Sequence, residues 1–166
     1  MPEQPHIRIA PPRDEPDWRA ARDLLVDYSE SLGFSLTYQG FEAEVSSFPG
    51  EYAAPAGALL LAVVDATAAG IVALRRLEPD VCEMKRLFVR PEFRGVRTTD
   101  GLSLGRALAS EVVNRARELG YRRMRLDTIA GKMDAAIALY RSMGFVEIAP
   151  YCDSPVPGTL FMEKRL

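Results

Sequence analysis

Apolar residues recur every three or four positions in several stretches of the chain, and this spacing predicts amphipathic helices. Asp14 can cap the first helix, and a glycine follows each of the three long helices, at Gly33, Gly120 and Gly144. The predicted helices cover residues 14–32, 41–45, 104–119 and 135–143.

Short apolar runs bounded by turn residues predict strands between and after these helices. The small residues Asp65–Gly70 predict the turn of a hairpin, and Pro91 ends the strand that follows it. The segment 150–158 is rich in proline and glycine and predicts a loop. The predicted strands are Ile7–Ile9, Leu59–Val64, Ile71–Leu77, Val81–Val89, Arg123–Asp127, Phe145–Ile148 and Thr159–Glu163.

The order of these elements predicts one α/β (α+β) domain over residues 1–166, with a mixed sheet of six to seven strands flanked by helices. A helix connects Val81–Val89 to Arg123–Asp127, so we expect these two strands to be adjacent and parallel. The imperfect alternation along Val81–Val89 also indicates a bulge.

The composition narrows the classes of protein that fit. A hydrophobic content of 48% and a charged content of 27% over 166 residues are typical of a globular domain. The formal net charge of −2 and the absence of a long apolar run give no reason to expect a nucleic acid or a membrane as partner. Two cysteines outside any CxxC pair, and a start without the layout of a signal peptide, predict a cytoplasmic protein with free thiols. Since the single histidine is His6, near the terminus, we expect neither histidine catalysis nor a metal site.

The stretch Arg94–Leu108, RGVRTTDGLSLGRAL, joins a predicted strand to a predicted helix. Its ends, Arg94-Gly95 and Gly105-Arg106, look like the two halves of a phosphate-binding turn with extra residues between them. Amides at a helix N-terminus and the helix macrodipole suit a phosphate or pyrophosphate. An ordinary surface loop, whose glycines only permit tight turns, is the alternative, and the glycine spacing alone does not separate the two.

Four segments in order carry a resemblance to a known family: CEMKRLFV, RPEFRG, GRALASEVVNRARELGYRRMRLDT and AAIALYRSMGF. Together they resemble the core of a GNAT-superfamily N-acetyltransferase, over about Leu59–Leu166. The resemblance implies that the chain binds acetyl-CoA as cosubstrate and transfers its acetyl group directly to a primary amine, on a small molecule or a peptide. It implies no metal.

The superfamily's pyrophosphate motif is (Q/R)-x-x-G-x-(G/A), and this chain has six more residues between the two ends of its turn. The added residues cost little closure entropy, so we expect the ends to bind and the middle to bulge into solvent. The amides of Val96 or Arg97 can still face the phosphates, and Gly101 can replace the middle glycine. The resemblance also places the backbone of the preceding strand along the pantetheine arm. The cofactor-binding residues it implies are Leu87, Phe88, Val89, Arg94, Gly95, Val96, Arg97, Gly101, Gly105 and Arg106.

The resemblance also implies two catalytic side chains. Glu83 lies where some members have a glutamate that acts as base, and its alternative is a solvated strand carboxylate paired with Lys85 or an arginine. Tyr140 matches the tyrosine that protonates the coenzyme A thiolate, and its alternative is a half-buried core residue. Asp127-Thr128, at the end of its predicted strand, either borders the acceptor site or simply ends the strand. For Cys82 and Cys152 we expect packing rather than nucleophilic roles.

Two classes of function fit these residues. The first is an acetyl-CoA-dependent N-acetyltransferase. Its acceptor pocket is shaped by segments 28–52 and 150–158, and a homodimer is compatible with this class. The second is a CoA-binding or interaction module on the same fold that has lost catalysis, with the altered turn as its mark. Acetylation of aminoacyl-tRNA is disfavoured by the acidic charge balance.

Overall fold

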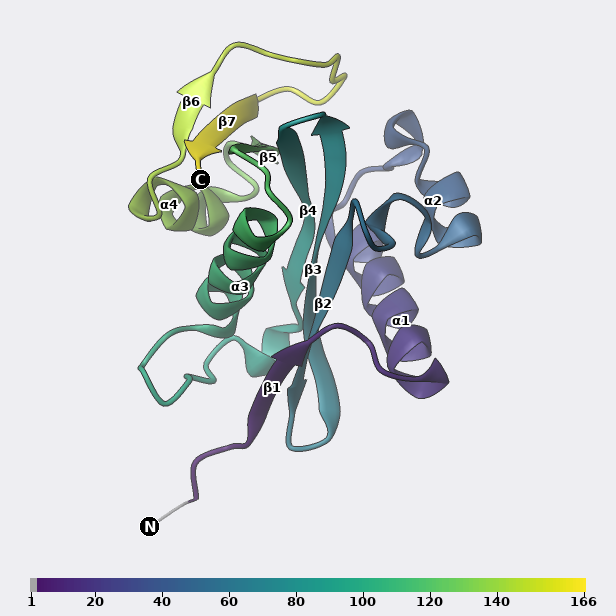
Figure 1. Ribbon diagram of the computed structural model, residues 1–166, viewed down its shortest axis with the longest axis vertical. Coiled ribbons are helices and arrows are strands. Elements are labelled where there is room, and N and C mark those ends of the chain that lie inside the picture. The colour runs from purple at the N-terminus through teal and green to yellow at the C-terminus, as the bar shows by residue number, and fades with distance from the viewer. Residues whose placement is uncertain (1–2) are drawn as a thin grey trace.

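The computed structural model describes residues 3–166, which form a seven-stranded mixed sheet with helices on both faces (Figure 1). The strands are β1 (Ile7–Ala10), β2 (Ala58–Val64), β3 (Thr67–Glu78), β4 (Val81–Val89), β5 (Arg123–Ile129), β6 (Val146–Ile148) and β7 (Thr159–Arg165). The helices are α1 (Glu15–Ser31), α2 (Phe41–Ser47), α3 (Leu104–Glu118) and α4 (Asp134–Ser142). The strand order across the sheet is β1-β2-β3-β4-β5-β7-β6.

The fold expected from the sequence is confirmed. β4 and β5 are adjacent and parallel, with α3 as the crossover helix between them, and every other strand pair in the sheet is antiparallel. The capping residue expected for the first helix is also confirmed, because the Asp14 side chain accepts a hydrogen bond from the Asp17 amide at 3.0 Å.

The turn between β2 and β3 is shorter than the sequence predicts. Only Asp65 and Ala66 lie between the strands, both with positive φ (46° and 68°), as in a two-residue hairpin turn. Gly70 instead pairs with Ala62 inside the ladder, where an added Cβ would lie 2.7 Å from the Phe88 carbonyl oxygen. Gly70 therefore has no side chain because the strands approach closely there, and not because the chain turns.

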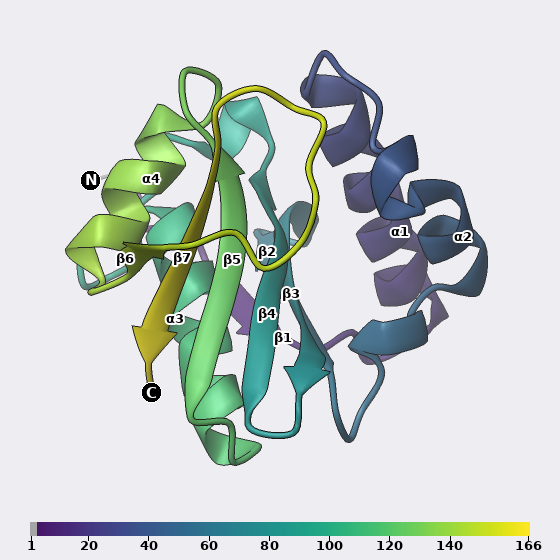
Figure 2. The same ribbon diagram turned by 90° about the horizontal axis from the view of Figure 1, so that it is seen from above.

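Each face of the sheet has its own hydrophobic core. Leu104, Leu108 and Val112 of α3 are buried against β2, β3 and β4 on one face, and Leu24 and Leu25 of α1 are buried on the other. Figure 2 shows α4 on the same side as α3, and α2 on the same side as α1. Because side chains alternate along a strand, β4 and β5 send every second side chain toward the α1 and α2 side.

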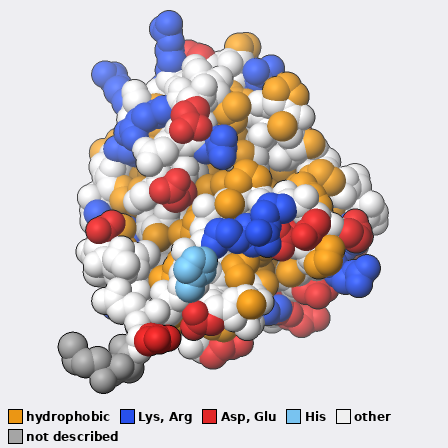
Figure 3. Space-filling view, turned by 60° about the horizontal axis from the view of Figure 1, so that its bottom comes forward, with side chains coloured by type: hydrophobic (Ala, Val, Ile, Leu, Met, Phe, Trp, Pro, Cys, Tyr) orange, Lys and Arg blue, Asp and Glu red, His pale blue; other side chains and the backbone are white. Residues whose placement is uncertain are grey.

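The segment between β6 and β7 arches over the sheet toward the side of α1 and α2 (Figure 2). Figure 3 shows one face of the molecule, on which acidic and basic side chains lie next to one another without a continuous basic stripe among the coloured residues. Within residues 3–166, no helix has the length and apolar character needed to cross a membrane. The same residues contain no group of three His, Cys, Asp or Glu side chains arranged to hold a metal ion.

Candidate active site

The parallel strands β4 and β5 separate after a short paired stretch. Their ladder joins only Val81–Glu83 to Arg123–Arg125, so the later backbone groups of β4 on that side have no strand partner. A cavity of about 140 Å³ lies in this gap, lined by β4, β5 and α4. We call it the strand-gap cavity. Its walls offer backbone donors and acceptors to an extended ligand.

A β-bulge in β4 lies beside this cavity. Arg86 and Leu87 together oppose the single residue Val72 of β3. Arg86 has a φ of 63°, which is rare for a residue other than glycine. Its guanidinium donates to both carboxylate oxygens of Glu44, at 3.0 and 2.8 Å, and this pairing holds the bulge in place. The bulge expected from the alternation of this strand is confirmed.

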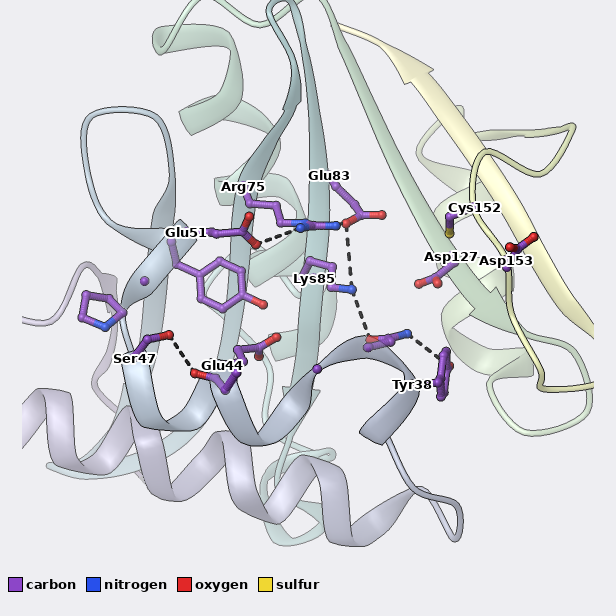
Figure 4. Close-up of a pocket in the computed structure, with 16 residues that line it drawn as sticks. Tyr38, Glu44, Ser47, Glu51, Arg75, Glu83, Lys85, Asp127, Cys152 and Asp153 are labelled. Carbon is purple, nitrogen blue, oxygen red and sulfur yellow. Dashed lines mark hydrogen bonds and ion pairs between the residues drawn. The ribbon is translucent and has the colours of Figure 1, made fainter.

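A larger cavity of about 380 Å³ lies on the α1 and α2 side of the sheet (Figure 4). We call it the acidic cavity. Its walls come from residues 38–52, from β3, β4 and β5, and from the segment between β6 and β7. The two cavities meet at residues that line both of them. These shared residues are Tyr38, Gln39, Lys85 and Asp127.

Glu83, the predicted base, is buried and held at both carboxylate oxygens. The Arg75 guanidinium donates to Oε1 at 2.8 Å, the Tyr151 hydroxyl donates to Oε2 at 2.6 Å, and the Lys85 ammonium lies 3.9 Å from Oε1. Burial acts to raise the pKa of Glu83, but Lys85, Tyr151 and Arg75 outweigh it and hold that pKa below its ordinary value. The alternative of a solvated carboxylate is therefore wrong, although the pairing with Lys85 and an arginine is confirmed. The role of Glu83 as base stays a prediction.

Two partners of Glu83 were not identified from the sequence. Arg75 opposes Glu83 in the β3–β4 ladder, but counting outward from the Pro79-Asp80 turn would have paired Glu83 with Arg76, because a bulge between Arg76 and Glu78 shifts the register by one residue. Tyr151 reaches Glu83 from 68 positions away, and no local pattern indicates that contact. The hydrogen bond from Tyr151 to Glu83 connects the segment between β6 and β7 to β4.

Asp127 lies on β5 where the two cavities meet. Among the described residues, no other residue donates a hydrogen bond to its carboxylate, and no cation lies within the 4.0 Å of an ion pair. Burial raises the pKa of Asp127, and the nearby Lys85 ammonium opposes part of that rise. The strand continues past this residue to Ile129. Of the two alternatives left open by the sequence, Asp127 therefore borders the cavity and does not end the strand.

Tyr140, the predicted acid, lines the strand-gap cavity from α4. Its ring packs against Phe145 with 5.7 Å between centroids, and the residue is 7% exposed. Burial raises its pKa, so the hydroxyl keeps its proton at neutral pH. A buried tyrosine hydroxyl usually has a hydrogen-bond partner, and no described residue supplies one here. The hydroxyl is thus free to donate to a ligand in the cavity.

The long turn between β4 and α3 closes on itself. Arg97 and Ser103 form an antiparallel bridge, and the Thr98 amide donates to the Leu102 carbonyl at 2.9 Å. Residues 98–102 therefore form a small hairpin, and the three residues at its tip, 99–101, are exposed, as predicted for the middle of the turn. Figure 1 shows the hairpin extending away from α3. The bridge brings Arg97 beside the start of α3, so the added residues do not hold the two ends of the turn apart.

The glycines of this turn serve different purposes. Gly101 has a φ of 80°, and its amide donates to a carbonyl inside the hairpin. The Val96 amide is also occupied, by a carbonyl 3.1 Å away in the preceding turn. These hydrogen bonds occupy the amides of Gly101 and Val96, which leaves Arg97, the alternative to Val96, as the expected amide in this part of the turn. Gly95 and Gly105 have no positive φ, and a Cβ at either would meet nothing within 4 Å. The fold does not itself require glycine there, which is consistent with close approach of a ligand.

The start of α3 presents amides without intrahelical acceptors. Ser103 caps the helix by accepting from the Arg106 amide at 3.2 Å. Leu104 and Gly105 occupy the first turn, where no carbonyl lies one turn earlier in the helix. The Arg106 side chain donates to the Ser142 hydroxyl of α4 at 2.8 Å. This end of α3 therefore combines helix amides with a guanidinium between two helices.

The other predicted residues are placed in different ways. Leu87 lines the strand-gap cavity, whereas Phe88 and Val89 are buried in the cores on opposite faces of the sheet. Only the backbone of those two residues can contact a ligand in the gap. Cys82 is buried, and burial raises its pKa to about 12, as expected for a packed thiol. Cys152 is exposed beside the acidic cavity, so the expectation that it packs is wrong.

Comparison with known proteins assigns this arrangement to a family. Residues 18–145 match the acetyltransferase (GNAT) family. An uncharacterised N-acetyltransferase from Schizosaccharomyces pombe is 37% identical over 157 residues, which cover 93% of this chain and 90% of that protein. The chain belongs to the acetyltransferase (GNAT) family. It is an acetyl-CoA-dependent acyltransferase, and the resemblance inferred from its sequence is confirmed.

Solved structures show that other proteins share the fold of this GNAT enzyme. A GNAT-family acetyltransferase from Staphylococcus aureus has a TM-score of 0.74 at 20% identity, with 96% of this chain and 99% of that chain covered. An acetyltransferase from Salmonella typhimurium, solved with its cofactor acetyl-CoA, has a TM-score of 0.64 at 18% identity, with 98% and 94% covered.

Proposed function

We propose that this GNAT acyltransferase transfers the acetyl group of acetyl-CoA directly to a primary amine. The observation that carries the proposal is the meeting of two cavities at Lys85 and Asp127. The strand-gap cavity suits an extended thioester arm, because β4 and β5 leave backbone groups unpaired there. The acidic cavity suits a protonated amine, because it is lined by five acidic side chains and two basic ones. These are Glu44, Glu51, Glu83, Asp127 and Asp153 against Arg75 and Lys85.

The donor would lie along β4 and reach the start of α3. The backbone of residues 87–89 would hold the pantetheine arm, and the amides of Gly95, Arg97 and Gly105 would face the pyrophosphate, with Arg94 and Arg106 adding charge. The Salmonella typhimurium relative was solved with acetyl-CoA, which supports this donor for the shared fold. Each arginine already makes one hydrogen bond, from Arg94 Nε to the Val89 carbonyl at 3.1 Å and from Arg106 Nη1 to the Ser142 hydroxyl at 2.8 Å.

The transfer needs a neutral amine and a protonated leaving group. An alkylammonium has a pKa of about 10.4, so the acceptor must lose a proton before its nitrogen attacks the thioester carbon. The buried or partly buried carboxylates of the acidic cavity are Glu44, Glu83 and Asp127. Arg86 already donates to both oxygens of Glu44, which leaves Glu83 and Asp127 as the candidates to accept the proton. When the C–S bond breaks, Tyr140 would donate its hydroxyl proton to the coenzyme A thiolate. No covalent enzyme intermediate is required.

A combined binding and turnover experiment tests the proposal. The free protein is melted with and without acetyl-CoA, and acetylation is followed on ethanolamine, 1,4-diaminobutane, L-lysine methyl ester and a tetra-alanine peptide. Acetyl-CoA at a hundred times its Kd stabilises the fold by about 2.7 kcal/mol. We expect this stabilisation together with turnover on at least one amine. Stabilisation without turnover across the panel would instead favour a CoA-binding module that has lost catalysis.

A further inference from the structure

We propose that Asp127 binds the acceptor's ammonium group and takes its proton, while Glu83 is a positioning residue. The inference rests on the proposed function and assigns the base of that reaction to a different strand from the one that the family resemblance indicates. It makes Asp127 a catalytic residue, and it gives the acidic cavity a defined contact for the reacting nitrogen.

The position of Asp127 is the first observation. It lines both cavities, so a nitrogen bound to its carboxylate lies where the acceptor side meets the donor side. Tyr140 lines the strand-gap cavity from α4. A nitrogen held by Asp127 would therefore lie beside the cavity that takes the thioester.

The second observation is that the Asp127 carboxylate has no bonding partner among the described residues. Within residues 3–166 it receives no hydrogen bond from another residue and has no ion-pair partner, although it is partly buried. Glu83 lines the same acidic cavity but has partners, because Arg75 and Tyr151 donate to its two oxygens. In Figure 4 dashed lines reach Glu83 and none reaches Asp127. The Asp127 oxygens are not among the fully buried unpartnered atoms of the described residues, so the carboxylate is open to the cavities that it lines, where a bound ammonium would be its partner.

The surroundings of Asp127 make its carboxylate a better proton acceptor than the carboxylate of Glu83. Burial raises its pKa, whereas the contacts of Glu83 lower the pKa of that residue. The charged groups that face Asp127 from β4 are Glu83, Lys85 and Arg86. The other titratable groups that face it are Tyr28 from α1, Tyr140 from α4, and Tyr151 and Cys152 from the segment before β7. The burial of Tyr28, Tyr140 and Tyr151 raises their pKa values, so they stay neutral over the working range of pH.

The proton balance of the step is complete. One proton moves from the ammonium to the Asp127 carboxylate, and the neutral nitrogen forms a C–N bond to the acetyl carbon as the C–S bond breaks. The thiolate takes the Tyr140 proton. The nitrogen loses its second proton to solvent as the amide forms, and solvent returns one proton to Tyr140. Asp127 then releases its proton to solvent, so the net products are the amide, coenzyme A and one proton.

The test compares Asp127→Asn with Glu83→Gln in the full chain, using the panel amine with the highest kcat/KM for the wild type. We expect Asp127→Asn to lower kcat/KM at pH 7 by at least about 100-fold, the usual contribution of a general base. Its rate should then rise with pH toward the pKa of the free amine, so the deficit shrinks on going to pH 10. Glu83→Gln should keep the shape of the wild-type pH profile. The control is Asp23→Asn, because Asp23 is an exposed residue of α1 that lines neither cavity, and it should change neither quantity.

Melting temperature and acetyl-CoA affinity separate catalysis from folding. Asp127→Asn removes a partly buried charge that lacks a partner, so its melting temperature should equal or exceed that of the wild type, with acetyl-CoA affinity unchanged. Glu83→Gln should melt lower. The inference is overturned if Asp127→Asn keeps wild-type kcat/KM, or if Glu83→Gln alone acquires the rising pH profile. Failure of the proposed function looks different, since the wild type would then acetylate no amine while acetyl-CoA still stabilises it.

Discussion

At the scale of single residues, Tyr140 combines burial with an unused hydroxyl. We predict that Tyr140→Phe lowers kcat by about 100-fold or more and leaves the Kd for acetyl-CoA within about twofold, because only a late proton transfer is lost. Steady-state kinetics and calorimetry measure the two quantities. Tyr121→Phe is the matched control, since the Tyr121 hydroxyl donates to the Ala56 carbonyl at 2.6 Å and that residue lines neither cavity. Equal turnover in Tyr140→Phe and wild type would exclude Tyr140 as the acid.

Arg106 carries a second prediction at this scale. If its guanidinium contacts the pyrophosphate, Arg106→Ala should weaken acetyl-CoA binding by about 1–3 kcal/mol, or about 5- to 150-fold in Kd. Ser142→Ala removes the present partner of Arg106 and keeps its charge, so it should leave the Kd nearly unchanged. Calorimetry at two salt concentrations measures both variants. The same loss in both would mean that Arg106 acts by joining α3 to α4 and not by contacting the ligand.

At the scale of elements, the hairpin of residues 98–102 is separable from the turn that carries it. Arg97 and Ser103 already face each other across an antiparallel bridge, where Cα atoms lie about 4.5–5.5 Å apart. Joining them directly requires about 3.8 Å, so little of the turn has to move. We therefore predict that deleting Thr98–Leu102 preserves acetyl-CoA affinity or improves it, as measured by calorimetry. The structure also shows that a deletion should spare Val96, which packs against the α3-side core.

The deletion has a control and a contrary result. Replacing residues 98–102 with five glycine and serine residues keeps the length of the hairpin and removes its side chains, and it too should bind acetyl-CoA. A correctly folded deletion variant that no longer binds, beside a replacement variant that also fails, would show that the side chains of the hairpin form part of the site. Circular dichroism on both variants establishes that the fold is intact.

At the scale of the whole molecule, the structural features that the sequence predicts correctly are those that depend on residues close together along the chain. Helix periodicity, the Asp14 cap and the parallel pair β4 and β5 all follow from local spacing and connection rules. The β2–β3 turn predicted from the sequence is too long, because small residues occur both in turns and where strands pack closely, as at Gly70. Local pattern alone does not distinguish those two causes.

The candidate site was predictable only in part, for a related reason. Glu83 and Tyr140 were found through family motifs, which are local in sequence. The feature that separates Glu83 from Asp127 is the set of partners around each carboxylate, and those partners come from distant parts of the chain. Tyr151 lies 68 positions from Glu83, and the cavity that Asp127 borders is closed by residues 38–52. Such long-range contacts are set by packing, which a single sequence does not display.

The network around Glu83 leads to a prediction for the stability of the whole fold, since it joins β3, β4 and the segment before β7. Glu83→Gln leaves Arg75 and Lys85 with less compensating charge, and we expect a loss of about 2–3 kcal/mol in the free energy of unfolding at pH 7. The pKa of Glu83 is lower in the folded state than its ordinary value. Its stabilisation is therefore fully present above the unfolded pKa of about 4.3 and is lost as pH falls through the folded pKa.

The difference in stability between wild type and Glu83→Gln should thus be widest at neutral pH and narrow on acidification. Urea unfolding at pH 7, 5, 4 and 3 measures it. Glu118→Gln is the control, because Glu118 forms an exposed pair with Arg115 at 3.4 Å and such pairs contribute about 0.5 kcal/mol or less. If the difference for Glu83→Gln is the same at pH 5 and pH 3, the charge of Glu83 does not hold the network together. Its effect would then come from packing and from the Tyr151 hydrogen bond, which a glutamine can still accept.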